Sequence, residues 1–201
     1  MRVAIIGTRQ PTADMAGLCR KVSIAFRDIG WELVTGNAKG IDSIARDAWN
    51  ETCPERVTLV LPWPEYNRDK IHPANKIVVF DNQMDWLLSV KLYHPAYAQL
   101  SEAEIKLHAR NYGIIFHADV VIAFPNDGKE SGGTGQGIRV ARALGKKLFV
   151  LPGDLDTLRS FWRKAYINFC AASLADALTE DDFLLLPEVK QKLLTLLKKQ
   201  Q

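Results

Sequence analysis

The residues with the clearest chemical potential form a glycine-rich segment in the second half of the chain. Its sequence, Ser131-Gly132-Gly133-Thr134-Gly135-Gln136-Gly137, lies between an apolar run at 120–124 and an alanine-rich helical pattern. Such a connection leaves backbone N–H groups accessible and directs the positive end of a helix dipole toward a ligand. We therefore expect it to bind phosphate, although glycines also permit close packing of a helix on a strand. The residues concerned are Gly132, Gly133, Thr134, Gly135 and Gln136.

This segment differs from two common phosphate-binding motifs. A P-loop would place Lys and then Ser or Thr after its last glycine, whereas Ile138 follows Gly137 here. The dinucleotide fingerprint GxGxxG, with an acidic residue about 20 positions later, is not matched either. Other parts of the chain must therefore support the assignment.

A second candidate is the loop that follows the apolar residues 3–6. Gly7 permits a tight turn, Thr8 offers a hydroxyl group, and Arg9 offers a planar guanidinium group that can donate two parallel hydrogen bonds to phosphate. The alternative is that Arg9 is a surface residue beside an ordinary strand-to-helix turn.

A third candidate is the loop at residues 36–42. Gly36 and Gly40 enclose Lys39, and Asp42 lies near the start of the following helical pattern. Asp42 is expected either to cap that helix by accepting a backbone N–H or to accept ribose hydroxyls of a nucleotide, and the two roles are compatible.

Arg110 and Asn111 lie near the end of the helix that precedes the apolar run at 120–124. From there an arginine can reach a phosphate held by the glycine-rich segment, so both residues are added to the predicted site. The neighbouring His108 is expected to be a packed or exposed helical residue rather than an acid or base.

The elements that must position these residues alternate between strand and helix. Apolar runs that are typical of strands buried on both faces occur at 3–6, 32–35, 58–61, 120–124 and 147–151. Helical patterns occur at 13–29, 41–50, 101–116 and 137–144. The order predicts a Rossmann-like three-layer α/β fold with a mostly parallel sheet, in which ligands bind at the carboxyl ends of the strands. All three candidate loops should then face one crevice.

Two segments fit this alternation less well. Residues 62–100 are rich in aromatic residues and proline and show no single period, so we interpret them as an insertion between sheet elements. Residues 153–201 are expected to form a short C-terminal helical extension that follows the main domain at 1–152. Within it, residues 193–197 are leucine-rich.

Composition limits the possible settings. With 201 residues and 47% hydrophobic residues, the chain can bury one sizeable core, and a net charge of +3 is compatible with nucleic-acid partners without proving them. The three cysteines, Cys19, Cys53 and Cys170, are far apart and indicate neither a zinc site nor a disulfide framework. We expect a cytoplasmic protein with no metal, cofactor, signal peptide or membrane span.

Taken together, these motifs resemble the SLOG superfamily, which joins the DprA/Smf DNA-processing proteins to the LOG-type nucleotide phosphoribohydrolases. The opening strand with Gly7-Thr8-Arg9 is similar to the Gly-Ser-Arg loop of DprA/Smf. Residues 35–42, Thr-Gly-Asn-Ala-Lys-Gly-Ile-Asp, are similar to its Ser-Gly-x-Ala-x-Gly-Ile-Asp, the most specific match. The resemblance covers residues 1–152 and is closest to small stand-alone DprA-like proteins of phage genomes.

The LOG-type element of an arginine followed by Gly-Gly-x-Gly-Thr is matched only in part. Those enzymes carry a Glu shortly after the Gly-Thr, whereas Gln136, Gly137 and Ile138 occupy that stretch. The carboxylate expected to assist glycosidic bond cleavage is therefore missing, and only Asp42 and Glu130 are weak substitutes.

Three hypotheses follow. In the first, the domain binds a nucleotide or single-stranded DNA for DNA processing, with Trp63 or Tyr66 stacking on a base. In the second, it is a LOG-type nucleoside 5′-monophosphate N-glycosidase. In the third, it is a structural or inhibitory partner protein without a ligand. The resemblance also implies a homodimer.

Overall fold

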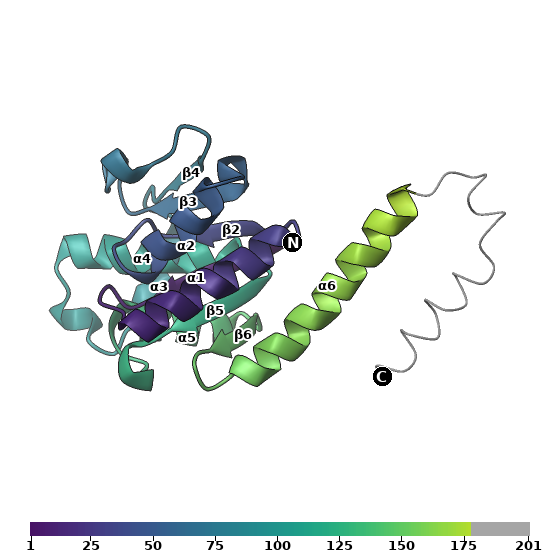
Figure 1. Cartoon of the computed structure of the whole chain (residues 1–201). Coiled ribbons are helices and arrows are strands. Elements are labelled where there is room, and N and C mark those ends of the chain that lie inside the picture. The colour runs from purple at the N-terminus through teal and green to yellow at the C-terminus, as the bar shows by residue number, and fades with distance from the viewer. Residues whose placement is uncertain (178–201) are drawn as a thin grey trace. The chain divides into compact units, whose positions relative to one another are not determined.

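Six parallel strands form one sheet in the order β4-β3-β2-β1-β5-β6 (Figure 1). The computed structural model describes residues 1–177 of the chain. The strands are β1 (Arg2–Gly7), β2 (Glu32–Thr35), β3 (Val57–Leu61), β4 (Lys76–Val79), β5 (Val120–Phe124) and β6 (Lys147–Val150). The predicted Rossmann-like α/β fold with a parallel sheet is confirmed.

Helices cover both faces of this sheet. They are α1 (Ala13–Asp28), α2 (Ile41–Asn50), α3 (Met84–Tyr93), α4 (Glu102–Phe116) and α5 (Gly132–Ala143). A further helix, α6 (Leu155–Ala177), follows β6. Alternate strand residues, such as Ala4, Val34 and Val121, point into a core shared with α3, α4 and α5. Because successive side chains of a strand point to opposite faces, the strand residues between these point toward α1 and α2, which pack together on the other face.

Aromatic residues near the start of α6 add to the core on the face of the sheet that α1 and α2 cover. The Phe161 ring lies 6.5 Å from Phe26, 6.0 Å from Trp31 and 5.3 Å from Phe149 between ring centroids. Trp162 donates a hydrogen bond of 2.9 Å from its indole N–H to the Ala25 carbonyl oxygen. The first part of α6 is therefore fixed to the domain by packing and by a partly buried hydrogen bond.

The chain forms two compact units, Met1–Trp162 and Arg163–Gln201, and α6 begins in the first and continues into the second. Its presence confirms a helical C-terminal region as far as Ala177, whereas the leucine-rich residues 193–197 lie outside the described residues. The domain boundary at residue 152 stays a prediction. None of the helices within residues 1–177 is both long and apolar enough to cross a membrane.

The segment at 62–100 contributes two elements that the sequence analysis did not assign. β4 pairs in parallel with β3 as the edge strand of the sheet, and α3 packs on α4. The interpretation of this segment as an insertion is not tested, but it contains part of the sheet and of the core.

The strand order places a topological switch point at β1. The chain builds β2, β3 and β4 on one side of β1 and then crosses to add β5 and β6 on the other side. In open parallel sheets, ligands bind outside the carboxyl ends of the strands at such a point. The fold therefore predicts a ligand site at the carboxyl ends of β1 and β5.

Candidate functional site

The connections after β1, β2 and β5 are joined to one another by backbone contacts. The Thr8 N–H donates to the Phe124 carbonyl oxygen at 2.9 Å, and the Thr8 carbonyl oxygen accepts from the Ile41 N–H at 3.1 Å. Glycine makes this approach possible: Gly40 has a φ of +81°, and a Cβ there would lie 2.4 Å from the Thr8 oxygen. The three predicted loops thus meet at one place.

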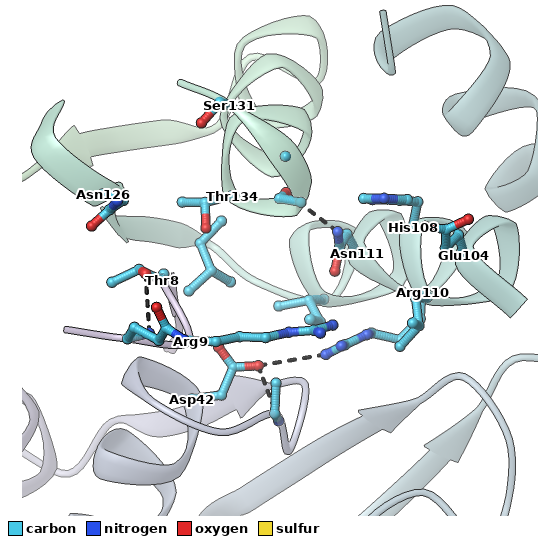
Figure 2. A pocket seen from close by; sticks show the side chains of 18 residues that line it. Thr8, Arg9, Asp42, Glu104, His108, Arg110, Asn111, Asn126, Ser131 and Thr134 are labelled. Atoms are coloured by element: carbon cyan, nitrogen blue, oxygen red, sulfur yellow. Dashed lines mark hydrogen bonds and ion pairs between the residues drawn. The ribbon is translucent and has the colours of Figure 1, made fainter. Parts of the chain in front are cut away.

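A pocket of about 520 Å³ lies where these connections meet (Figure 2). Its size suits a single nucleotide or a comparable small ligand. The predicted site residues that line it are Gly7, Thr8, Arg9, Asp42, Arg110, Asn111, Gly132, Gly133 and Thr134.

Arg110 and Asp42 form a buried ion pair at the floor of the pocket. Arg110 Nη1 lies 3.5 Å from Asp42 Oδ2, and the two residues are only 4% and 6% exposed. The same Asp42 oxygen accepts the N–H groups of Gly36 at 3.2 Å and Ala38 at 3.4 Å. Burial raises the pKa of Asp42, and the facing Arg110 and both backbone N–H groups oppose that rise. Asp42 therefore orients Arg110.

Two further contacts hold the Arg110 guanidinium in place. A Cβ on Gly36 would lie 1.1 Å from Arg110 Nη1, so glycine leaves the space that the guanidinium occupies. On another side the Arg110 Cζ atom lies 5.6 Å from the centre of the Tyr66 ring, within the range of a cation–π interaction. Within the described residues, the buried Arg110 Nε has no hydrogen-bond partner.

Positive charge and backbone donors converge on the same pocket. Figure 2 shows the Arg9 side chain extending across the pocket toward Arg110. Gly132, Gly133 and Thr134 form the first turn of α5, whose N-terminal N–H groups lack intrahelical acceptors, and Ser131 forms no side-chain cap there. An anion in this pocket would meet two guanidinium groups and a helix N-terminus.

His108 lines the pocket from α4 and is not charged near neutral pH. Burial, helped by the nearby His94, lowers the pKa of His108 to about 4. The two imidazole rings lie 4.2 Å apart between centroids, and the Nδ1 atoms of both are buried without a hydrogen-bond partner among the described residues. His108 therefore presents a neutral imidazole to the pocket rather than a further positive charge.

Several predicted residues lie outside the pocket. Gly36 and Gly40 act through the packing described above, and Lys39 is exposed at the surface. A Cβ on Gly135 would lie 2.0 Å from the Glu130 carbonyl oxygen, so this glycine permits close packing at the start of α5. Gln136 is fully buried, and its amide contacts Asn111 and the His108 backbone. These residues shape the pocket without lining it.

Glu130 is one of the two carboxylates considered in place of the missing catalytic glutamate, and it is paired with Arg142 outside the pocket. Both of its carboxylate oxygens accept hydrogen bonds of 2.6 Å from the Arg142 guanidinium, and Glu130 is not among the residues that line the pocket. The Arg142 contact lowers the pKa of Glu130, so it is ionised and paired. The other carboxylate, Asp42, is held by Arg110.

Some residues that line the pocket are not among the predicted site residues. Glu104, Leu107, His108 and Asn111 recur at the i, i+3, i+4 and i+7 positions of α4, which is the periodicity of one helix face. That spacing could have identified the face once Arg110 and Asn111 were chosen. Asn126 follows the end of β5 as Thr8 follows the end of β1, so the strand-end rule could have found it.

The arrangement is suited to holding an anion rather than a metal. Within residues 1–177 no three His, Cys, Asp or Glu side chains come together closely enough to hold a metal ion. The pocket instead combines two arginines, a helix N-terminus and hydroxyl groups of Thr8, Ser131 and Thr134. A phosphate group with attached polar atoms matches this set of donors.

Solved structures share this fold at low sequence identity. DNA processing protein A from Helicobacter pylori, described with a unique single-stranded DNA binding mode, has 23% identity and a TM-score of 0.56, with 81% of this chain and 73% of that chain covered. DNA processing protein A (DprA) from Streptococcus pneumoniae has 19% identity and a TM-score of 0.53, over 92% of this chain and 61% of that chain.

The same fold occurs in a protein with a different described ligand. The molybdenum cofactor binding protein from Rippkaea orientalis has 18% identity and a TM-score of 0.53, over 89% of this chain and 97% of that chain. At these identities the likeness shows the fold alone. No curated protein sequence matches the chain.

The family of this chain follows from its amino-acid sequence rather than from its fold. The profile of the family described as DNA recombination-mediator protein A matches residues 1–184, which extends beyond the 1–152 covered by the resemblance noted from the motifs. This match confirms the resemblance to DprA/Smf proteins. The chain belongs to the DNA recombination-mediator protein A family.

Proposed function

We propose that this protein binds single-stranded DNA in the pocket between β1, β5 and α5 and acts in DNA processing, with a single nucleotide as the minimal ligand. The observation that carries the proposal is Arg110, a buried guanidinium aimed into the pocket, with Arg9 and the α5 N-terminus beside it. Family membership and the single-stranded DNA binding described for the Helicobacter pylori protein support DNA as the ligand.

In this proposal one phosphate binds between the two arginines and the first turn of α5. Thr8 and Thr134 supply hydroxyl groups to it, and the backbone N–H groups of Gly133 and Thr134 supply fixed donors. Lys39 is exposed next to Ala38, which lines the pocket, and it takes a neighbouring phosphate of the strand. Gly132, Asn111 and the remaining predicted residues shape the cavity.

Base stacking is assigned to the segment after β3. Tyr66 packs on Arg110, and Trp63 packs on Tyr66 with 5.3 Å between ring centroids and an interplanar angle of 89°. The segment is tied to the β2–α2 loop because Asn67 Nδ2 donates to the Asn37 carbonyl oxygen at 2.8 Å, and Asn37 Nδ2 donates in return at 3.1 Å. Tyr66 is therefore held next to Arg110, with Trp63 against it, although neither ring is among the residues that line the pocket.

Binding without bond cleavage is favoured over an N-glycosidase. That reaction needs a carboxylate that faces the sugar as positive charge develops on it. Here Asp42 Oδ2 accepts from Arg110 and from two backbone N–H groups, and both oxygens of Glu130 are paired with Arg142 outside the pocket. We also propose a cytoplasmic homodimer, on the basis of the cysteine pattern and the family resemblance. Sedimentation equilibrium of the full chain tests the dimer.

The binding proposal is tested by fluorescence anisotropy with labelled single-stranded oligonucleotides at several salt concentrations. The logarithm of the affinity should fall linearly with the logarithm of the salt concentration, with a slope of about −0.7 for each phosphate contact. An affinity that does not respond to salt, or equal affinity for an uncharged polymer, would contradict the proposal. A panel of mononucleotides in the same assay defines the minimal ligand.

A further inference from the structure

The orientation of the Asn111 side-chain amide is determined by a chain of hydrogen bonds behind the pocket. Gln136 Nε2 donates to the His108 carbonyl oxygen at 3.2 Å, which turns Gln136 Oε1 toward Asn111. Asn111 Nδ2 then donates to that Oε1 at 2.9 Å and to the Gly133 carbonyl oxygen at 3.3 Å. A carbonyl oxygen only accepts, so turning either amide over would place oxygen against oxygen.

This chain of bonds is rigid because its centre is buried. Gln136 is fully buried on α5, and the residues that it joins, His108 and Asn111, lie one helical turn apart on α4. Both hydrogens of Asn111 Nδ2 are used by acceptors of the protein. The remaining polar atom, Oδ1, is directed to the pocket side, as Figure 2 shows, and no donor within the described residues bonds to it.

The consequence is a fixed acceptor inside a pocket whose other groups mainly donate. Arg9, Arg110 and the α5 N–H groups donate to an anion, and one oxygen of the Glu104 carboxylate, Oε2, already accepts from the backbone N–H and the hydroxyl of Ser101. A phosphate oxygen cannot bond to Asn111 Oδ1, because both atoms are acceptors. A buried acceptor left unpaired in a complex costs binding free energy, so the preferred ligand must carry a donor at this point.

We propose that Asn111 is a specificity-determining residue, oriented by Gln136 as a positioning residue, which accepts a hydrogen bond from an N–H or O–H group of the bound nucleotide. The inference rests on the proposed function and deepens it, because it assigns a selective contact beside the phosphate site. The donor has two sources in a nucleotide, an N–H of the base or the 2′-hydroxyl of a ribose, which share the same chemistry.

Two matched pairs of oligonucleotides distinguish these sources. Oligo-dT against the same oligomer with N3-methylthymine removes one base N–H donor, and oligo-rU against oligo-dU removes the 2′-hydroxyl. The wild-type protein should bind the donor-bearing member of one pair about five- to tenfold more tightly. Preference within the first pair identifies the base as the source, and preference within the second identifies the sugar.

Two variants test the residues themselves. In Asn111→Ala the preference should fall to near onefold, because the acceptor is removed. In Gln136→Leu the same loss of preference is expected although residue 111 is unchanged, because its amide is then free to turn. Gln99→Ala, an exposed amide outside the pocket, is the matched control and should keep the wild-type preference. Circular dichroism checks that each variant is folded.

The outcomes separate this inference from the proposed function. Equal wild-type affinity for both members of both pairs, or a preference that survives Asn111→Ala, would overturn the role of Asn111 while leaving DNA binding in place. Loss of preference in Asn111→Ala but not in a folded Gln136→Leu would overturn the role of Gln136 alone. No binding of any oligonucleotide by the wild type would overturn the proposed function and this inference with it.

Discussion

Arg110 Nη1 and Asp42 Oδ2 lie 3.5 Å apart at the floor of the pocket, although the two residues are 68 positions apart in the sequence. The pair joins α4 to the start of α2, on either side of the strand ends that form the pocket. Because both side chains are buried, neither charge can be compensated by water if its partner is removed. The pair therefore links ligand binding to the stability of the fold.

The first prediction concerns this pair. Arg110→Ala should lower the free energy of unfolding by about 3 kcal/mol or more, because it leaves Asp42 buried without its cationic partner. DNA binding should be lost as well. Asp42→Asn leaves Arg110 buried without its anionic partner and should also destabilise the protein. Urea unfolding and anisotropy measure the two effects, and an Arg110→Ala protein as stable as the wild type would refute the structural role of the pair.

Arg9→Ala is expected to separate binding from stability. The side chain is exposed, so the free energy of unfolding should change by less than about 0.5 kcal/mol. The affinity for single-stranded DNA should fall, and the salt slope should become shallower by about 0.7 because one phosphate contact is removed. Arg20→Ala, an exposed arginine of α1 that pairs with Glu51, is a suitable control. An unchanged salt slope in Arg9→Ala would exclude it from the phosphate contacts.

Gly36→Ala should disturb the guanidinium position directly. The added methyl group would lie 1.1 Å from Arg110 Nη1, so the arginine must move away from Asp42. We expect a loss of about 1–3 kcal/mol of stability together with weaker DNA binding. Gly17→Ala on α1, where a methyl group meets no atom within 4 Å, is the matched control and should be neutral or slightly stabilising. Normal DNA affinity in Gly36→Ala would show that the Arg110 position is not critical.

The pH dependence of stability should contain a contribution from His108. Its pKa in the folded protein is about 4, below the ordinary value of 6.5, chiefly because of burial. Between these values the unfolded chain binds more protons, so stability should rise with pH from about 4 to 6.5 and be lost as the pH falls. His94 and Arg110 disfavour charge on His108, and Glu104 favours it. His108→Asn should flatten this part of a stability–pH profile measured by urea unfolding.

Glu130→Gln addresses the enzymatic alternative. Glu130 and Arg142 form a partly exposed pair, with side chains 32% and 54% exposed, so the change should cost no more than about 1 kcal/mol. DNA affinity should stay within twofold of the wild-type value. Neither protein should release free base from nucleoside 5′-monophosphates in a chromatographic assay, and release that depends on Glu130 would favour the N-glycosidase.

The main strands were predictable because their burial leaves a strong pattern. Residues 120–124 are apolar throughout and form a strand that is buried along its whole length, with the bounds expected from the sequence. The start of α5 was predicted five residues too late, because the glycines from Gly132 onward have low helix propensity. They are accommodated because the helix packs closely: a Cβ on Gly137 would lie 2.7 Å from Ile6 Cδ1.

The segment at 62–100 could not be assigned for a different reason. α3 carries Met84, Leu88 and Leu92 on its exposed side and Trp86 and Val90 on its buried side. Apolar residues therefore surround the helix, and no helical period appears in the sequence. β4 is an edge strand whose residues are exposed or only partly buried, so it lacks the burial on both faces by which the other strands were recognised.

The candidate site was predictable in outline but not in its contacts. The rule that strand ends gather at one edge of a parallel sheet brought Arg9 and Asp42 together, and Arg110 was added because it lies on the helix before β5. It could not show that Gln136 points away from the pocket and bonds to Asn111, because both amides look equally suited to phosphate in the sequence. Such a distinction depends on the orientation of side chains in a packed helix pair.

The central position of β1 has a consequence for how the protein is made. One edge of β1 pairs with β2, the next strand along the chain, whereas its other edge pairs with the distant β5, and the Arg2 N–H donates to Asp119 across 117 positions. A nascent chain shorter than about residue 124 thus carries an unpaired strand edge in the middle of its future sheet. The ligand pocket is closed by the same step that removes this edge. A chain with a complete ligand pocket is therefore one in which the exposed edge has already been covered.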